Sequence, residues 1–80
     1  MREKIEIKEK GRSLLLYEVI SKDEIEKLGL ELICTSGKEY LFQGESGKYK
    51  MNPINNDYYH LVGIYELSHN KNETKILANN

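Results

Sequence analysis

Short runs rich in apolar, β-branched and aromatic residues alternate with small polar segments over the second half of the chain. The runs have the length of single strands, and the segments between them contain Gly, Ser, Asn and Asp, which tight turns favour. Connections this short join antiparallel neighbours, because a parallel crossover needs about a dozen residues. The pattern therefore predicts four antiparallel strands, at residues 31–35, 38–44, 48–52 and 58–68.

The N-terminal part of the chain predicts a hairpin. Residues 4–8 alternate polar and apolar side chains, as a strand buried on one face does. Residues 13–19 are apolar on both faces, which is typical of a central strand. The segment between them contains Gly11, which can adopt a positive φ, so we expect a turn there that pairs the two strands.

One short helix is expected after this hairpin. Ser21 and Glu24 have the spacing of a capping box, in which each side chain satisfies a backbone N–H of the other residue. Ile25 and Leu28 form a short apolar stripe, and Gly29 is placed to end the helix in a left-handed conformation. A helix of two turns cannot stand alone, so it must pack on the sheet.

The longest expected strand, residues 58–68, has two apolar faces. Strict alternation places Tyr59 and Tyr65 on one face and Ile64 on the other. Gly63 at its centre predicts a bulge or a bend. If this strand lay at a sheet edge, it would be a template for pairing, and this leads us to expect a homodimer.

These elements predict a mostly β protein of the α+β class. We expect a small antiparallel sheet or a partly closed barrel with one short helix, in the order β-β-α-β-β-β-β. Residues 1–69 are interpreted as a single domain. Residues 70–80 are polar apart from a short apolar segment, and we expect a frayed C-terminal tail there.

Composition limits the classes of protein to which the chain can belong. Its 80 residues carry 12 basic and 13 acidic side chains, a near balance that does not indicate nucleic acid binding by bulk charge. The single cysteine excludes an internal disulfide, and no apolar run approaches the length of about 18 residues that a membrane span requires. With no signal peptide expected at the N-terminus, these features predict a cytoplasmic location.

Candidate catalytic and metal-binding residues are few. His60, Glu66 and His69 have the chemistry of metal ligands, but on one strand they lie too far apart to meet around one ion. Cys34 lies in an apolar strand, so a buried, inert thiol is expected. We find no catalytic signature, and we expect a non-enzymatic protein without metal or cofactor.

The strongest candidate for a binding site is a segment that combines a polar loop with two aromatic rings. Tyrosine suits protein interfaces because it brings apolar area and a hydroxyl group at a small entropic cost. We therefore predict that the chain binds a protein partner through Asn55, Asn56, Asp57, Tyr58 and Tyr59.

Residue usage suggests a role for such a binder. Lys, Ile and Asn are frequent while Pro and Ala are scarce, a usage typical of AT-rich genomes. Small accessory binders of this composition are common on viruses and mobile elements, where they inhibit host machinery. This association suggests a virus-encoded or mobile-element-encoded inhibitor.

A nucleic-acid-binding or nucleotide-binding β-barrel is the alternative function. Exposed strand aromatics framed by lysines can stack bases and hold phosphates. The residues in question are Lys38, Tyr40, Phe42, Lys48, Tyr49 and Lys50. Alternation favours a core position for the aromatic residues, because Lys48 and Lys50 point away from Tyr49 along the strand.

Overall fold

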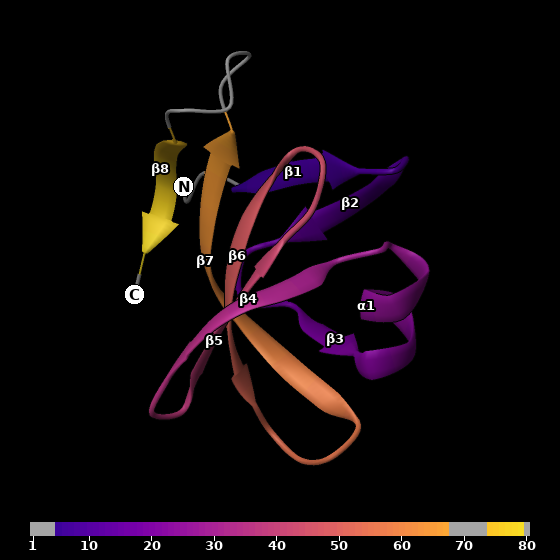
Figure 1. Ribbon diagram of the computed structural model, residues 1–80. Coiled ribbons are helices and arrows are strands. Elements are labelled where there is room, and N and C mark those ends of the chain that lie inside the picture. Colours follow the sequence, from indigo (N-terminus) through magenta and orange to yellow (C-terminus); the bar gives the residue numbers. More distant parts are fainter. Residues whose placement is uncertain (1–4, 68–73, 80) are drawn as a thin grey trace.

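The computed structural model describes residues 5–67 and 74–79, which form two layers of β-structure with one short helix (Figure 1). Strands β1 (Glu6–Glu9) and β2 (Arg12–Leu15) pair as a hairpin. The larger, six-stranded sheet contains β3 (Val19–Ser21), β4 (Glu31–Ser36), β5 (Glu39–Gln43), β6 (Gly47–Pro53), β7 (Tyr58–Leu67) and β8 (Thr74–Asn79). Helix α1 (Lys22–Lys27) follows β3 in the chain.

Short turns join strands β4 to β7 into a continuous antiparallel meander, with β4 at one edge of the sheet. On the other side of β7, β3 pairs with the beginning of that strand and β8 pairs with its end. The predicted mostly β, antiparallel α+β fold is therefore confirmed, and the strands that the structure describes do not close into a barrel.

Three features of the topology differ from the sequence-based expectation. Residues 13–19 are not one strand, because the chain turns after β2 and pairs again as β3, so the order begins β-β-β-α. Strand β8 lies in the segment 70–80, for which a frayed tail was expected, while residues 70–73 and 80 lie outside the described part. Strand β7 has neighbours on both sides, so it is not an edge that could pair with a second copy.

The helix has the predicted start and end. The Ser21 Oγ accepts a hydrogen bond from the Glu24 N–H at 3.1 Å, which satisfies one of the free donors of the first turn. Gly29 has a φ of +68°, and the N–H of Leu30 donates to the carbonyl of Ile25 at 3.1 Å. This is the hydrogen-bond pattern of a Schellman close, in which glycine adopts the left-handed conformation without a steric cost.

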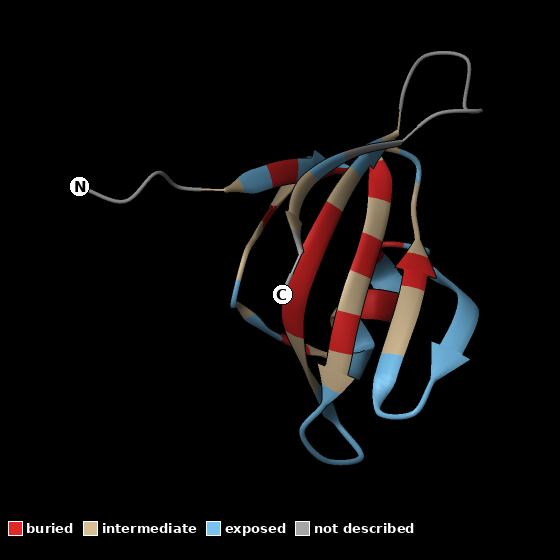
Figure 2. Ribbon diagram, turned by 90° about the vertical axis from the view of Figure 1, so that its left-hand side faces the viewer, coloured by how far each residue is buried: buried red, intermediate tan, exposed pale blue. Residues whose placement is uncertain are grey.

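The core lies between the sheet and a second layer made of α1 and the β1–β2 hairpin. Figure 2 views the sheet from the side opposite α1, which lies behind the strands. From the sheet, the fully buried side chains of Tyr49, Met51, Leu61 and Ile64 face this layer, and Leu14 and Ile25 meet them from the other side. We call this the inner face of the sheet and the opposite one the outer face. Burying each such side chain stabilises the fold by about 1.5–3 kcal/mol.

A bulge changes which residues of β7 face the core. Lys50 pairs with Gly63 and Met51 pairs with Leu61, so Val62 is an extra residue on β7. The predicted irregularity next to Gly63 is therefore confirmed. The expected alternation is wrong beyond it, because Ile64 shares the inner face with Leu61.

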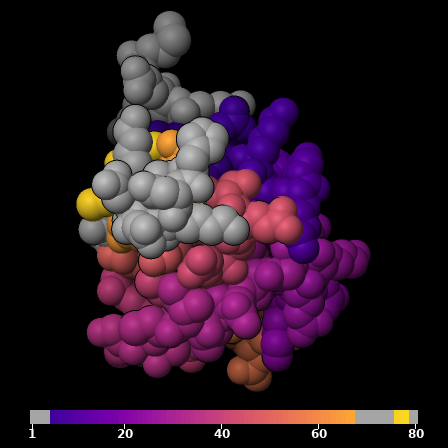
Figure 3. Space-filling model, turned by 45° about the horizontal axis from the view of Figure 1, so that its top comes forward, coloured from indigo at the N-terminus to yellow at the C-terminus, as the bar shows by residue number. Residues whose placement is uncertain are grey.

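A buried carboxylate joins the hairpin layer to the sheet. Glu9 at the end of β1 is fully buried, and its carboxylate accepts hydrogen bonds from the Glu45 N–H at 2.7 Å and the Ser46 N–H at 3.1 Å. The Tyr49 hydroxyl also donates to this carboxylate. Figure 3 shows the β5–β6 turn beside the β1–β2 hairpin. Burial, reinforced by the hydrogen bond to Glu9 and by its charge, raises the pKa of Tyr49 far above its ordinary value.

Candidate functional site

The loop between β6 and β7 contains most of the predicted partner-binding residues. Asn55, Asn56, Asp57 and Tyr58 are all exposed. The Asn55 Oδ1 accepts hydrogen bonds from the N–H groups of Asp57 at 2.8 Å and Tyr58 at 3.1 Å. An asparagine side chain that bonds to the backbone two residues later gives the loop a defined shape. The loop therefore has a defined shape and presents Tyr58 at the surface.

The two neighbouring tyrosines of the predicted site lie on opposite faces of β7. Tyr58 is exposed, whereas the Tyr59 ring packs edge-on against Phe42, with 5.5 Å between ring centroids, and lies 5.8 Å from the ring of Tyr40. Tyr59 is thus partly buried against the core. The structure brings Asn55, Asp57 and Tyr58 together at the surface but places the Tyr59 ring on the inner face.

Three residues outside the predicted site lie on the same side of the β3–β7 pair as Tyr58. Val19 pairs with His60, and Ser21 pairs with Tyr58, so Val19 and His60 share the face of Tyr58. The Tyr17 ring lies 6.0 Å from the His60 ring. Tyr17, Val19 and Tyr58 are 50%, 53% and 46% exposed. We call Tyr17, Val19, Tyr58 and His60 the Tyr58 surface.

Tyr17 has an unusual backbone conformation, with a φ of +71°. A bulky residue in the left-handed region is a conformational outlier that costs on the order of 1–3 kcal/mol. The turn that imposes it is tied to β7, because the Tyr17 N–H donates to the Leu61 carbonyl at 2.7 Å and the Leu61 N–H donates to the Glu18 carbonyl at 2.9 Å. These hydrogen bonds therefore fix the position of the Tyr17 backbone, from which the side chain extends.

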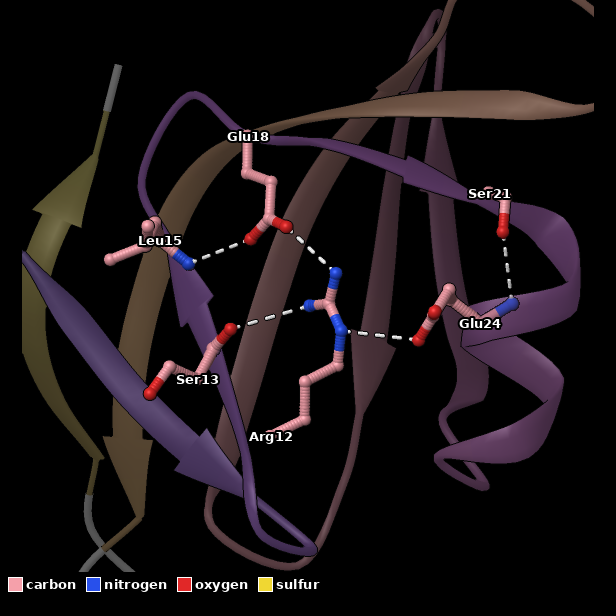
Figure 4. Close-up of polar contacts among 6 residues, drawn as sticks. All are labelled: Arg12, Ser13, Leu15, Glu18, Ser21 and Glu24. Carbon is pink, nitrogen blue, oxygen red and sulfur yellow. Dashed lines mark hydrogen bonds and ion pairs between the residues drawn. The ribbon is translucent and has the colours of Figure 1, made fainter.

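An arginine on β2 completes this support (Figure 4). Arg12 forms ion pairs with Glu18, at 2.7 Å, and with Glu24 of α1, at 3.1 Å. The Glu18 carboxylate also accepts the Leu15 N–H at 3.1 Å, across the turn that contains Tyr17. Arg12 thus connects β2, this turn and the helix. The expected capping box is formed on its Ser21 side, while the Glu24 carboxylate pairs with Arg12.

A polar hollow lies next to Tyr58. It has a volume of about 210 Å³ and is lined by Ser21, Lys22, Asp23, Asp57 and Tyr58. The Lys22 N–H donates to the Asp57 carbonyl at 2.8 Å, which joins the start of α1 to the β6–β7 loop. The Tyr58 surface therefore combines exposed apolar area with charged groups at its border.

The residues of the alternative nucleic-acid site are divided between the two faces of the sheet. Phe42 and Tyr49 are buried on the inner face, and Tyr40 is partly buried against the core, as alternation favours. Lys48 and Lys50 lie on the outer face, because they alternate with Tyr49 along β6. The remaining residue, Lys38, is exposed in the β4–β5 turn. The structure does not combine these aromatic rings and lysines into one surface.

The outer face has a shallow apolar groove of about 190 Å³, whose lining includes Cys34, Leu41, Lys50 and Tyr65. Lys50 forms an ion pair at 3.7 Å with Glu39 at the border of this groove. The prediction that Cys34 is buried is wrong: its thiol is free and exposed. The cause is the position of β4 at the sheet edge, where an apolar sequence does not imply burial.

The described residues contain no cluster of three or more His, Cys, Asp or Glu side chains that could hold a metal ion. His69, one of the candidate ligands, lies outside the described part of the chain. Within that part, no helix has the length and apolar character needed to cross a membrane. Comparison with protein-family models, with curated proteins and with solved structures found no match.

Proposed function

We propose that this protein is a non-enzymatic binding domain that recognises another protein through the Tyr58 surface. The observation that carries this proposal is the convergence of Tyr17, Val19 and Tyr58, each about half exposed, on one side of the β3–β7 pair. Large apolar side chains gathered on a surface are typical of interaction sites, whereas single exposed ones are ordinary.

The conformation of Tyr17 supports a role beyond folding. Asparagine or glycine would occupy a φ of +71° at a lower cost than tyrosine. Strain of this kind, held in place by the surrounding hydrogen bonds, gathers at functional sites. Two exposed tyrosines with a polar border also match the composition of protein interfaces, in which aromatic anchors lie inside a polar rim.

The proposal extends to the compartment and the biological role. A free, exposed thiol at Cys34 favours a reducing, intracellular environment. The role of an inhibitor encoded by a virus or mobile element rests on residue usage alone. The identity of the captured protein would decide that part of the proposal.

The test is affinity capture from a native lysate of the source organism, with and without nuclease, followed by mass spectrometry. The baits are the wild type, Tyr58→Ala and Tyr17→Asn. Ile76→Ala is the matched control, because it removes an exposed apolar side chain from β8, away from the Tyr58 surface. We expect one protein to be enriched whether or not nuclease is present, and both tyrosine variants to lose about tenfold or more of it, as interface anchors do.

Folding of the variants is checked independently by circular dichroism and urea denaturation. Tyr17→Asn should stay within about 1 kcal/mol of the wild type, because asparagine tolerates the left-handed conformation. Equal capture by the wild type and both tyrosine variants would refute the proposed surface. Enrichment that nuclease abolishes would instead support the nucleic-acid alternative.

A further inference from the structure

The turn between β2 and β3 has a conformation that its sequence does not favour. The Glu18 N–H donates to the Leu15 carbonyl at 3.1 Å, and Tyr17, the third residue of this four-residue turn, has a φ of +71°. A positive φ at the third residue is typical of a type II turn, which favours glycine or asparagine there. The contacts that keep a tyrosine in this conformation must therefore outweigh its steric cost.

The Glu18 side chain supplies such contacts with both oxygens of its carboxylate (Figure 4). Its Oε1 accepts the Leu15 N–H at 3.1 Å, so a second hydrogen bond joins the two ends of the turn. Its Oε2 accepts a hydrogen bond from the Arg12 Nη2 at 2.7 Å. Hydrogen bonds to an ionised group are stronger than those between neutral groups, and the bond to Leu15 exists only while the turn is closed.

The Arg12 guanidinium group is held at three points. Its Nε pairs with Glu24 of α1 at 3.1 Å, its Nη1 donates to the Ser13 carbonyl at 3.3 Å, and its Nη2 donates to Glu18. A planar guanidinium group can hold several acceptors in one fixed arrangement, whereas a lysine ammonium group does not reproduce this geometry. Arg12 therefore orients the Glu18 carboxylate through its shape as well as through its charge.

We propose that Arg12 and Glu18 form a clamp that holds Tyr17 in its left-handed conformation. In the clamped state, the Tyr17 ring lies 6.0 Å from the His60 ring, as the Tyr58 surface requires. Without the clamp the turn opens, Tyr17 relaxes to a negative φ, and its ring moves away from His60. The clamp thereby also sets the affinity of the Tyr58 surface, a consequence that rests on the proposed function. Only clamped molecules present the complete surface, so the apparent affinity falls in proportion to their fraction.

The first experiment measures the conformation of residue 17 by nuclear magnetic resonance on the full chain, without a partner. A positive φ brings the amide and α protons of a residue close together, and the Tyr17 ring shifts the signals of the His60 ring protons. Arg12→Lys keeps the charge but loses the guanidinium geometry, and Glu18→Gln keeps the size but loses one acceptor oxygen. We expect each to lower the ratio of clamped to open molecules by about tenfold or more, as the loss of a charge-assisted hydrogen bond implies. An unchanged conformation of residue 17 in both variants would overturn the proposal.

A double variant separates a lost clamp from a damaged fold. Asparagine adopts the left-handed conformation without help, so adding Arg12→Lys to Tyr17→Asn should leave the φ of residue 17 positive. Glu39→Gln is the matched control for Glu18→Gln, because it makes the same chemical change in the Lys50–Glu39 ion pair, away from this turn. It should leave the conformation of residue 17 unchanged. Relaxation of residue 17 in the double variant or in the control would contradict the clamp.

Affinity capture tests the consequence for binding, with the protein that the wild-type bait enriches from the lysate as the probe. Its affinity for Arg12→Lys and Glu18→Gln should fall by the same factor as the clamped fraction measured by magnetic resonance. Arg12→Lys should cause no further loss in the Tyr17→Asn background, where the anchoring ring is already absent. A smaller clamped fraction with unchanged affinity would overturn the link between the clamp and the surface. A wild-type bait that enriches no protein would refute the proposed function, while the resonance measurement still decides whether the clamp exists.

Discussion

Replacement of Glu9 by Gln tests whether a buried carboxylate fastens the β5–β6 turn to the β1–β2 hairpin. In the wild type, one carboxylate oxygen accepts the Glu45 N–H, and the other accepts the Ser46 N–H and the Tyr49 hydroxyl. Glutamine keeps the size of the side chain but has only one oxygen. With the amide oxygen in the Oε2 position, the partly buried Glu45 N–H faces an NH₂ group; with the oxygen in the Oε1 position, the Ser46 N–H keeps only its longer bond of 3.4 Å and loses the one of 3.1 Å.

The structure allows the size of this effect to be estimated. A hydrogen bond to a charged group contributes about 1.5–3 kcal/mol, and a buried donor left without an acceptor costs about 1–3 kcal/mol. The two figures partly describe the same loss, so we expect Glu9→Gln to lower the free energy of unfolding by about 2–4 kcal/mol. An 80-residue domain has a total of roughly 4–12 kcal/mol. The substitution should therefore remove a large part of the stability.

Urea denaturation followed by far-ultraviolet circular dichroism measures this change, since the chain has no tryptophan to report on folding. Glu6→Gln is the matched control, because it makes the same chemical change at an exposed position of β1. It should alter stability by less than about 0.5 kcal/mol. If Glu9→Gln costs no more than this control at an unchanged denaturant slope, the carboxylate does not hold the turn and the reasoning is refuted.

Two further predictions concern the same region. Tyr49→Phe should reduce the loss of folding free energy that the wild type shows at alkaline pH. In the wild type, the unfolded chain loses the Tyr49 phenolic proton near pH 10, whereas the folded chain keeps it. The free energy of unfolding therefore falls above about pH 10, by up to about 1.4 kcal/mol per pH unit. Urea titrations of both proteins at about pH 8 and pH 11 measure the difference, and equal losses would contradict the assigned cause. Gly47→Ala should destabilise by about 1–3 kcal/mol or more, because its Cβ would lie 2.5 Å from the carbonyl oxygen of Tyr65. Glu45→Ala, in the same turn, is its control, and equal melting temperatures for the two variants would show that the turn accommodates the added methyl group.

The parts of the fold that the sequence predicts well are those with local causes. The helix begins at Ser21 and ends at Gly29 because their side chains, or the lack of one, satisfy the backbone within a few residues. Hairpin turns such as the one at Gly37 have equally local signals. The position of Tyr49 in the core likewise follows from alternation along a single regular strand.

The errors in the sequence-based analysis have non-local causes. The bulge at Val62 changes the face of every later residue of β7, and alternation cannot indicate which residue is the extra one. Strand β3 has only three residues and depends on pairing with β7, about forty residues further along the chain. Cys34 looked buried because its neighbours are apolar, but burial depends on whether a strand lies inside the sheet or at its edge, which the sequence alone does not indicate.

The same reasoning explains why the sequence predicts only part of the Tyr58 surface. Reading along the chain groups Tyr58 with Tyr59, yet neighbours in a strand point to opposite faces, and the spatial neighbours of Tyr58 come from the turn and strand around Val19.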